Sequence, residues 1–319
     1  MAALALVGDI GGTNSRFGLV EPGETRVGDI EALKNDNFPS LEEAARAYLA
    51  KRNIASLAAT AVAIAGPVSG GRYTLTNRDW TFTDHSLKSA VSTERLRVLN
   101  DFEALALSLP HLGDEDLVQI GGETPAKPAL KLVLGPGTGL GSAALAPLPG
   151  GCWMALPGEL GHITLPVVTR EEFDLREAMM TPGEVFDSEF AVTGGGLLLI
   201  YRTLCRLGGI EPRQATPEAV LKSALARSDE IATHTLHHFI IWLARLAGDA
   251  AMTMLAHGGV YLAGGIAPSI VDELKKGPFR SVFEEKGRLA HVMRPMPIYV
   301  IVASYPALIG CAAAIAQKP

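Results

Sequence analysis

Cysteine is scarce in this sequence, with only three in 319 residues. They lie far apart, at Cys152, Cys205 and Cys311, and none belongs to a CxxC pair. A disulfide framework needs an even set of closely spaced cysteines, so none is predicted. This pattern fits a protein of the reducing cytosol, and we expect a cytoplasmic location.

Long apolar runs are also missing. A membrane-spanning helix needs about 18 or more uncharged apolar residues. The nearest candidate, residues 239–256, contains Arg245 and Asp249, which indicates a core helix instead. The first residues carry no basic segment and reach Asp9 early, so a signal peptide is not expected.

The chain has no excess of positive charge. Lysine and arginine number 28 against 34 aspartates and glutamates, a net charge of −6. Such a balance gives no basic surface for nucleic acid or anionic membranes. With 48% hydrophobic and 19% charged residues, the chain can bury a large core, which excludes disorder as its main state. The length suggests two domains, at about 100–200 residues each.

What the sequence has in quantity is glycine, and two glycine turns share the same context. Each lies between two short apolar runs, which predicts a β-hairpin. The first unit comprises residues 3–7, the turn Gly8–Asn14 (GDIGGTN) and residues 16–20, and the second comprises residues 131–134, the turn Gly135–Gly141 (GPGTGLG) and residues 142–146. The recurrence hints at an internal duplication. Alternation of strands with helices along the rest of the chain favours an α/β protein of two similar halves.

Glycine turns of this kind suit a phosphate chain, because backbone N–H groups can approach it without side chains in the way. The candidate phosphate-binding residues are Gly8, Asp9, Ile10, Gly11, Gly12 and Thr13 in the first turn, and Gly137, Thr138 and Gly139 in the second. The carboxylate of Asp9 suits Mg²⁺, directly or through water. A third turn, Gly264–Gly265, leads from a strand towards a helix near Pro268. The alternative is that each turn is only a hairpin connection.

Other phosphate motifs fit less well. No GxxxxGK[ST] occurs, so a P-loop is excluded. Gly139, Gly141 and Ala144 match a loose dinucleotide-binding pattern. That pattern requires a helix after the glycines, whereas residues 143–149 predict a strand.

Asn100 and Asp101 follow an apolar strand, residues 96–99, and precede a helix over residues 102–109. Ligands of α/β proteins collect at the carboxyl ends of strands. An aspartate there can accept the proton of a hydroxyl that attacks a γ-phosphate. The alternative is an Asx-type cap at the start of the helix.

Glu159 and His162 stand three residues apart in the segment Pro157–His162 (PGELGH), between two glycines. A carboxylate beside an imidazole suits the vicinal hydroxyls of a sugar, and it equally suits a pair of metal ligands. A surface loop is the third alternative. Glu189 precedes another glycine turn, Thr193–Gly196.

Three histidines, His234, His237 and His238, lie on one predicted helix. A metal site of three histidines is conceivable, but the helix offers no carboxylate in register with them. We expect a partly exposed helix face instead.

Taken together, the motifs resemble those of the bacterial glucokinase family, within the hexokinase/actin/Hsp70 ATPase superfamily. The resemblance covers the whole chain and is carried by five motifs in the family's order, and by the stretch Thr76–Trp80 (TNRDW). The five are GDIGGTN, LNDF (residues 99–102), GPGTGLG, PGELGH and LAGGI (residues 262–266).

The resemblance implies two RNase H-like α/β domains with ATP and sugar in a cleft between them. A small domain would comprise residues 1–110, completed by 299–319, and a large domain residues 111–298. It implies that Asp101 is the catalytic base, and that Asn100, Asp101, Glu159, His162 and Glu189 bind glucose. The two glycine turns and Gly264–Gly265 would bind ATP, with Asp9 near Mg²⁺. A homodimer is the family expectation.

A related branch, the ROK kinases and repressors, carries a cysteine-rich zinc motif after the Glu–His element. Residues 163–166 (ITLP) contain no cysteine here. We therefore expect the zinc-free group and no structural zinc. Alternatives are a kinase of another hexose or N-acetylhexosamine, an actin- or Hsp70-like ATPase acting on protein partners, and a sugar-responsive regulator.

Overall fold

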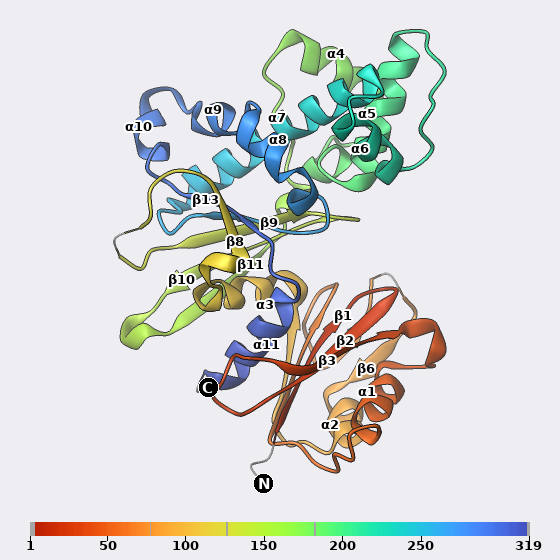
Figure 1. The fold of residues 1–319 in the computed structure, drawn as a ribbon, viewed down its shortest axis with the longest axis vertical. Coiled ribbons are helices and arrows are strands. Elements are labelled where there is room, and N and C mark those ends of the chain that lie inside the picture. The colour runs from red at the N-terminus through yellow and green to blue at the C-terminus, as the bar shows by residue number, and fades with distance from the viewer. Residues whose placement is uncertain (1–3, 77, 126, 182, 318–319) are drawn as a thin grey trace. The chain divides into compact units, whose positions relative to one another are not determined.

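The computed structural model describes residues 4–317, except residues 77, 126 and 182. Asn77, which belongs to the TNRDW stretch, therefore lies outside the described residues. The chain forms two compact units (Figure 1). The first contains residues 1–113, 147–157 and 303–319, and the second contains residues 114–146 and 158–302. Within the described part of the chain, no helix has the length and apolar character that crossing a membrane requires.

The first unit is built on a five-stranded sheet in the order β3-β2-β1-β4-β7. Its strands are β1 (Ala5–Ile10), β2 (Asn14–Val20), β3 (Gly28–Lys34), β4 (Ala59–Ile64) and β7 (Leu96–Asn100). Strand β1 is antiparallel to β2 and parallel to β4, and β4 is parallel to β7. The apolar residues of β1 and β4 are buried almost throughout, as expected for central strands with both faces covered.

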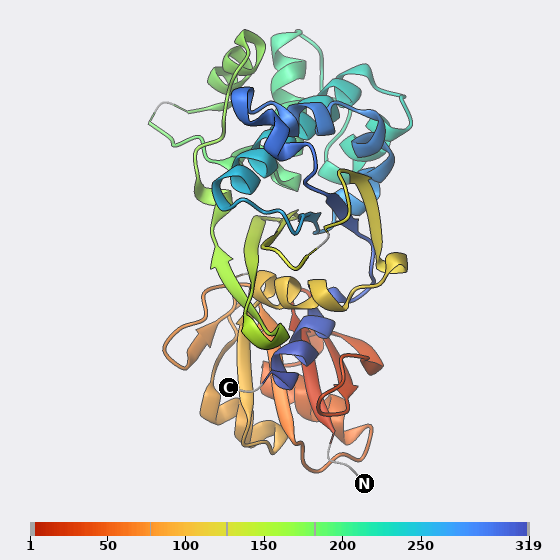
Figure 2. The ribbon, with the colours of Figure 1, turned by 90° about the vertical axis from the view of Figure 1, so that its left-hand side faces the viewer.

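Helices cover both faces of this sheet. One pair packs on one face and another pair on the opposite face, where α11 lies beside α3 (Figures 1 and 2). The helices are α1 (Leu41–Ala50), α2 (Asp84–Val91), α3 (Asp101–Ser108) and α11 (Pro306–Ala316). At the crossing of α11 with α3, a Cβ on Gly310 would lie 1.6 Å from the carbonyl oxygen of Ala104. Only glycine permits this approach. A two-stranded sheet of β5 (Arg72–Thr74) and β6 (Thr81–Thr83) completes the unit.

The second sheet has the order β11-β10-β9-β12-β13-β8. Its strands are β8 (Leu117–Gly121), β9 (Lys131–Pro136), β10 (Leu140–Pro147), β11 (Trp153–Gly158), β12 (Val260–Leu262) and β13 (Ile298–Ile301). Strand β9 is antiparallel to β10 and parallel to β12, and β12 is parallel to β13. The pairing around β9 thus matches the pairing around β1, which confirms the two predicted hairpins and the likeness of the two halves.

The helices of the second unit gather on one side of its sheet (Figures 1 and 2). They are α4 (Arg170–Met179), α5 (Gly194–Leu207), α6 (Pro217–Leu225), α7 (Glu230–Met254), α8 (Val271–Lys276), α9 (Phe279–Glu284) and α10 (Ala290–Met293). The long helix α7 is the centre of this core, because its apolar residues are buried along most of its length. The helix expected from Pro268 begins as the short 3₁₀ turn Ala267–Ile270 before α8.

Candidate active site

In the first unit, parallel strands bring three chain segments to one edge of the sheet. Ile10, Ile64 and Asn100 occupy the same level of β1, β4 and β7. The turn after β1, the loop after β4 and the start of α3 therefore leave the sheet together. Asp9, Asn100 and Asp101, which sequence patterns placed at strand ends, share this edge.

Asn35, a fully buried residue, stabilises the turn between β1 and β2 through hydrogen bonds. Its amide nitrogen donates to the carbonyl oxygens of Gly11 at 2.7 Å and Gly12 at 3.1 Å. Its Oδ1 accepts the hydroxyl of Ser15 at 2.7 Å. Sequence analysis missed Asn35, because one asparagine in a loop carries no signal without its partners.

Gly8 and Gly11 serve different structural purposes. A Cβ on Gly8 would lie 3.1 Å from Val62 and 3.3 Å from Phe17, so Gly8 serves packing within the unit. Gly11 closes the turn by donating to the carbonyl oxygen of Asn14 at 3.0 Å. The side chain of Thr13 is exposed.

Asp9 lies at the end of β1 and pairs with Arg16, whose guanidinium nitrogen is 3.2 Å from Oδ2. Its side chain is 27% exposed. Burial raises the pKa of Asp9, and the neighbouring Arg16 opposes the rise. A carboxylate oxygen is the ligand type that Mg²⁺ prefers, and one carboxylate beside bound phosphates is its usual protein contact. Asp9 fits that role.

Asn100 is the N-cap of α3. Its Oδ1 accepts the backbone N–H of Phe102 at 2.9 Å and of Glu103 at 3.3 Å. Its Nδ2 donates to the carbonyl oxygen of Gly66 at 3.3 Å. The Asx-type cap considered from the sequence is therefore present.

Asp101 is the first residue of α3. Its Oδ1 accepts the N–H of Phe102 at 2.9 Å. Burial, and to a smaller degree the charge of Asp9, raise the pKa of Asp101 to about 6, and the hydrogen bond from Phe102 opposes this rise. A carboxylate with a pKa near neutrality is an effective proton acceptor that is still ionised at pH 7.

In the second unit, the glycine turn between β9 and β10 is held by backbone contacts. Gly137 donates to the carbonyl oxygen of Gly139 at 2.8 Å, and its own carbonyl accepts the N–H of Gly194 at 2.9 Å. Gly194 is the first residue of α5, so the turn lies against that helix's N-terminus. The side chain of Thr138 is exposed.

The turn after β12 lies against the same segment. Gly264 has φ of +78°, and a Cβ there would lie 2.4 Å from the carbonyl oxygen of Pro136. Gly265 is exposed, and a Cβ there would meet nothing within 4 Å. Gly264 is thus required by backbone packing, whereas Gly265 leaves open space.

Two short 3₁₀ turns, Leu160–His162 and Ser188–Phe190, contact each other. His162 and Glu189 lie on these turns, and Glu159 directly precedes the first. Glu159 and His162 are exposed. The ring of His162 is 3.2 Å from Asp187, and this hydrogen bond raises its pKa. Sequence analysis missed Asp187, because its partner lies 25 residues away in the chain.

Glu189 also contacts the glycine turn between β9 and β10. Its Oε2 accepts the N–H of Leu140 at 3.1 Å and lies 3.2 Å from the position of a Cβ on Gly139. The structure therefore brings Glu189 to the turn as well as to His162. The three sugar-binding candidates of this unit form one group.

Comparisons with known proteins identify the family. The sequence model of the family described as Glucokinase matches residues 6–318. A glucokinase of Chromobacterium violaceum is 40% identical over 313 residues, which are 98% of this chain and 89% of that protein. This chain belongs to the glucokinase family.

A solved structure supports the same assignment. The crystal structure of a glucokinase from an Antarctic psychrotroph has a TM-score of 0.89 and 30% identity, and the match covers 99% of both chains. A ROK family glucokinase from Streptomyces griseus, solved with glucose and AMPPNP, has a TM-score of 0.63 and 19% identity over 98% of both chains. At that identity the likeness shows the fold alone. The α/β fold class predicted from the sequence is confirmed.

Proposed function

We propose that Asp101 is the general base with which this member of the glucokinase family transfers the γ-phosphoryl group of ATP to the 6-hydroxyl of D-glucose. The observation that carries the assignment is the raised pKa of Asp101, about 6, at the carboxyl end of β7. The base accepts the hydroxyl proton as the sugar oxygen attacks phosphorus in line. The reaction and its substrates are inferred from membership of the glucokinase family.

The glycine turns bind the phosphates in this proposal. Backbone N–H groups of Gly12 and Thr13 in the first turn, and of Thr138 and Gly139 in the second, face the negative charge that grows on the phosphoryl oxygens. Gly264 and Gly265 border the second turn and contact the nucleoside. Asp9 holds Mg²⁺, which neutralises charge on the phosphates when bound.

Sugar recognition falls to residues of both units. Glu159 and Glu189 accept hydrogen bonds from sugar hydroxyls, and His162, oriented by Asp187, adds a ring nitrogen. Asn100, at the N-terminus of α3, contributes its side-chain amide. We further propose a non-ROK member of the superfamily, without the cysteine-rich zinc motif of the ROK branch, that works as a cytoplasmic homodimer, as the sequence resemblance implies.

The test of the base is Asp101→Asn, assayed for glucose-dependent release of ADP with matching glucose 6-phosphate. Loss of a positioned base lowers kcat by about 100-fold or more. Asp272→Asn, an exposed aspartate on α8, is the matched control and should leave kcat unchanged. In the unchanged protein, kcat/KM falls about tenfold for each pH unit below 6, because Asp101 is then protonated.

Near-normal kcat in a folded Asp101→Asn protein would remove Asp101 from the reaction. Equal ATP turnover with and without glucose would instead favour an ATPase that acts on protein partners. Activity with other hexoses or N-acetylhexosamines at similar kcat/KM would broaden the substrate class.

The test of sugar recognition is Glu159→Gln. A charged acceptor of a sugar hydroxyl becomes a weaker neutral one, so KM for glucose rises about tenfold while KM for ATP stays unchanged. Glu218→Gln, an exposed glutamate on α6, is the control. An unchanged KM for glucose would exclude Glu159 from the site.

A further inference from the structure

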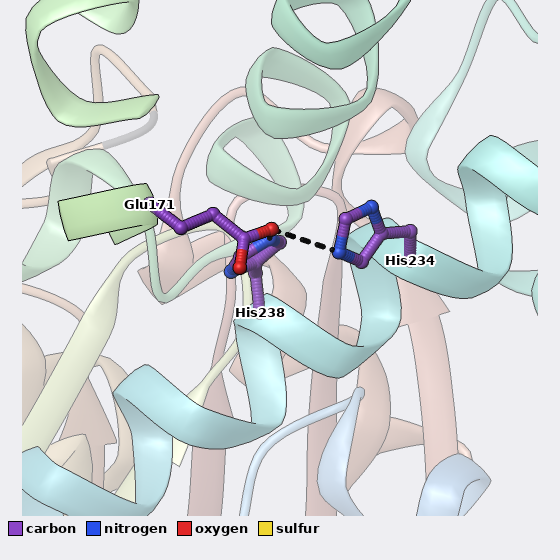
Figure 3. A group of neighbouring side chains, drawn as sticks. All are labelled: Glu171, His234 and His238. Carbon is purple, nitrogen blue, oxygen red and sulfur yellow. Dashed lines mark ion pairs between the residues drawn. The ribbon is translucent and has the colours of Figure 1, made fainter. Parts of the chain in front are cut away.

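Two histidines and a glutamate of the second unit meet away from the glycine turns. His234 and His238 stand four residues apart on α7, which places both side chains on one face of the helix. Glu171 reaches them from α4 (Figure 3). Its Oε1 is 3.1 Å from Nε2 of His234 and 3.2 Å from Nε2 of His238. The carboxylate that α7 itself does not offer thus comes from a second helix.

We propose that Glu171, His234 and His238 bind a divalent transition-metal ion of the zinc type, which joins α4 to α7. One ligand atom from each residue lies within 4.8 Å of the other two. Ligands at about 2.0–2.1 Å from a tetrahedral zinc are separated by roughly 3.3 Å, close to the two contacts observed. Two imidazoles and a carboxylate are a ligand set that zinc accepts and that Mg²⁺, which prefers oxygen, does not.

The state of His238 points to a missing partner. Its side chain is only 3% exposed. Among the described residues, neither of its ring nitrogens has a hydrogen-bond partner, although Glu171 is close to one of them. A buried polar nitrogen without a partner is unfavourable, and a metal ion on Nε2 would satisfy it.

The carboxylate of Glu171 is placed by its neighbours in α4. Thr169 caps the helix, and Glu172 accepts the backbone N–H groups of Val168 and Thr169. Glu172 also forms a buried ion pair with Arg245 of α7. The backbone at Glu171 is therefore attached to α7 before any metal binds. His234 and Glu171 are 45% and 62% exposed, so an ion can enter from solvent.

His237 is the natural control on the same helix. It is exposed and neighbours both histidines, with ring centres 6.4 Å from His234 and 6.2 Å from His238, but it does not belong to the ligand group. Glu177, an exposed glutamate on α4, is the control for Glu171, because it too lies outside the ligand group. Their substitutions change the same residue types without touching the site.

The experiment is isothermal titration calorimetry, in which zinc chloride is added to the chelator-treated full chain. The buffer contains magnesium chloride and no ATP. We expect one zinc per chain, with affinity lowered at least about tenfold in His234→Ala and Glu171→Gln and unchanged in His237→Ala and Glu177→Gln. At about 100-fold excess over Kd, zinc should raise Tm by roughly 5 °C in the unchanged protein and not in His234→Ala.

Cobalt provides a second measurement. A Co²⁺ ion on two imidazoles and a carboxylate in a tetrahedral site gives visible absorption that His234→Ala removes. Because His234 is half exposed, this variant should fold, and circular dichroism checks that it does. Zinc affinity equal in His234→Ala, Glu171→Gln and the unchanged protein, or no stoichiometric binding at all, would overturn the proposal and leave only glutamate–histidine ion pairs.

Discussion

The two units share a strand pairing but differ in what they place at the ends of the strands. In the first unit the strand ends carry charged or polar side chains, Asp9, Asn100 and Asp101. In the second unit, Gly137 follows β9 and Gly264 follows β12, and glycine offers only backbone groups. Similar strand pairings thus end in polar side chains in one unit and in bare backbone in the other.

The contacts that stabilise the two glycine turns also differ, with side-chain contacts in the first unit and mainly backbone contacts in the second. A buried amide, Asn35, holds the first turn through three hydrogen bonds. Backbone contacts with Gly194 and Gly264 hold the second turn. The carboxylate of Glu189 also accepts the N–H of Leu140, the residue after the turn. The first turn depends on one side chain, and the second depends on close packing. Substitutions at each support test this contrast.

The largest effect on stability is expected from Gly264→Ala. Alanine at φ of +78° is strained, and its Cβ would overlap the carbonyl oxygen of Pro136. The free energy of unfolding should fall by about 3 kcal/mol, measured by urea denaturation. Gly265→Ala has open space and should lose little. Equal losses in the two variants would show that the second turn does not depend on packing.

Asn35→Ala should have the next largest effect. It leaves the carbonyls of Gly11 and Gly12 without their donor and the hydroxyl of Ser15 without its acceptor, at a cost of about 2 kcal/mol. If the first turn binds phosphates, KM for ATP also rises. Asn37→Ala, an exposed asparagine nearby, is the control. Unchanged stability in Asn35→Ala would mean that the first turn holds itself.

The smallest effect concerns the stability cost of Asp101. Its pKa is about 6 in the folded chain against an ordinary 3.8, so the folded state binds the proton more tightly than the unfolded state. The resulting penalty is absent below pH 3.8, grows as pH rises, and is complete above about pH 6. Asp101→Asn removes it, so the stability gained should be about 1 kcal/mol larger at pH 8 than at pH 5. A gain independent of pH would contradict the raised pKa.

Local patterns predicted much of the fold. The apolar runs around GDIGGTN and GPGTGLG give the hairpins β1–β2 and β9–β10. Ser40 caps α1 by accepting the N–H of Glu43. The two residues have the spacing of a capping box, but the carboxylate of Glu43 contacts Arg46 instead of returning the bond. A charged side chain one turn away competed with the cap, and sequence spacing does not show which contact wins.

Contacts between distant segments could not be predicted. Asn35 acts on Gly11 from 24 residues away, and Asp187 acts on His162 from 25. His234 and His238 were expected on a partly exposed helix face without a carboxylate in register. The structure leaves His234 exposed but buries His238, and Glu171 arrives from another helix. Sequence periodicity describes one helix at a time, so a residue contributed by a second helix is invisible to it.

The position of α11 has a consequence for the order of events during synthesis. This helix comes from the last residues of the chain, yet it packs on the sheet formed by the first, and the thiol of Cys311 donates to the carbonyl oxygen of Gly8. All residues of the second unit have been made once residue 302 has been added, whereas the first unit still lacks residues 303–319. Because domains fold as units while the chain emerges, the half that contains the N-terminus must wait for the C-terminus. The strands of the first sheet, which are made before the second unit, thus acquire their full core after it.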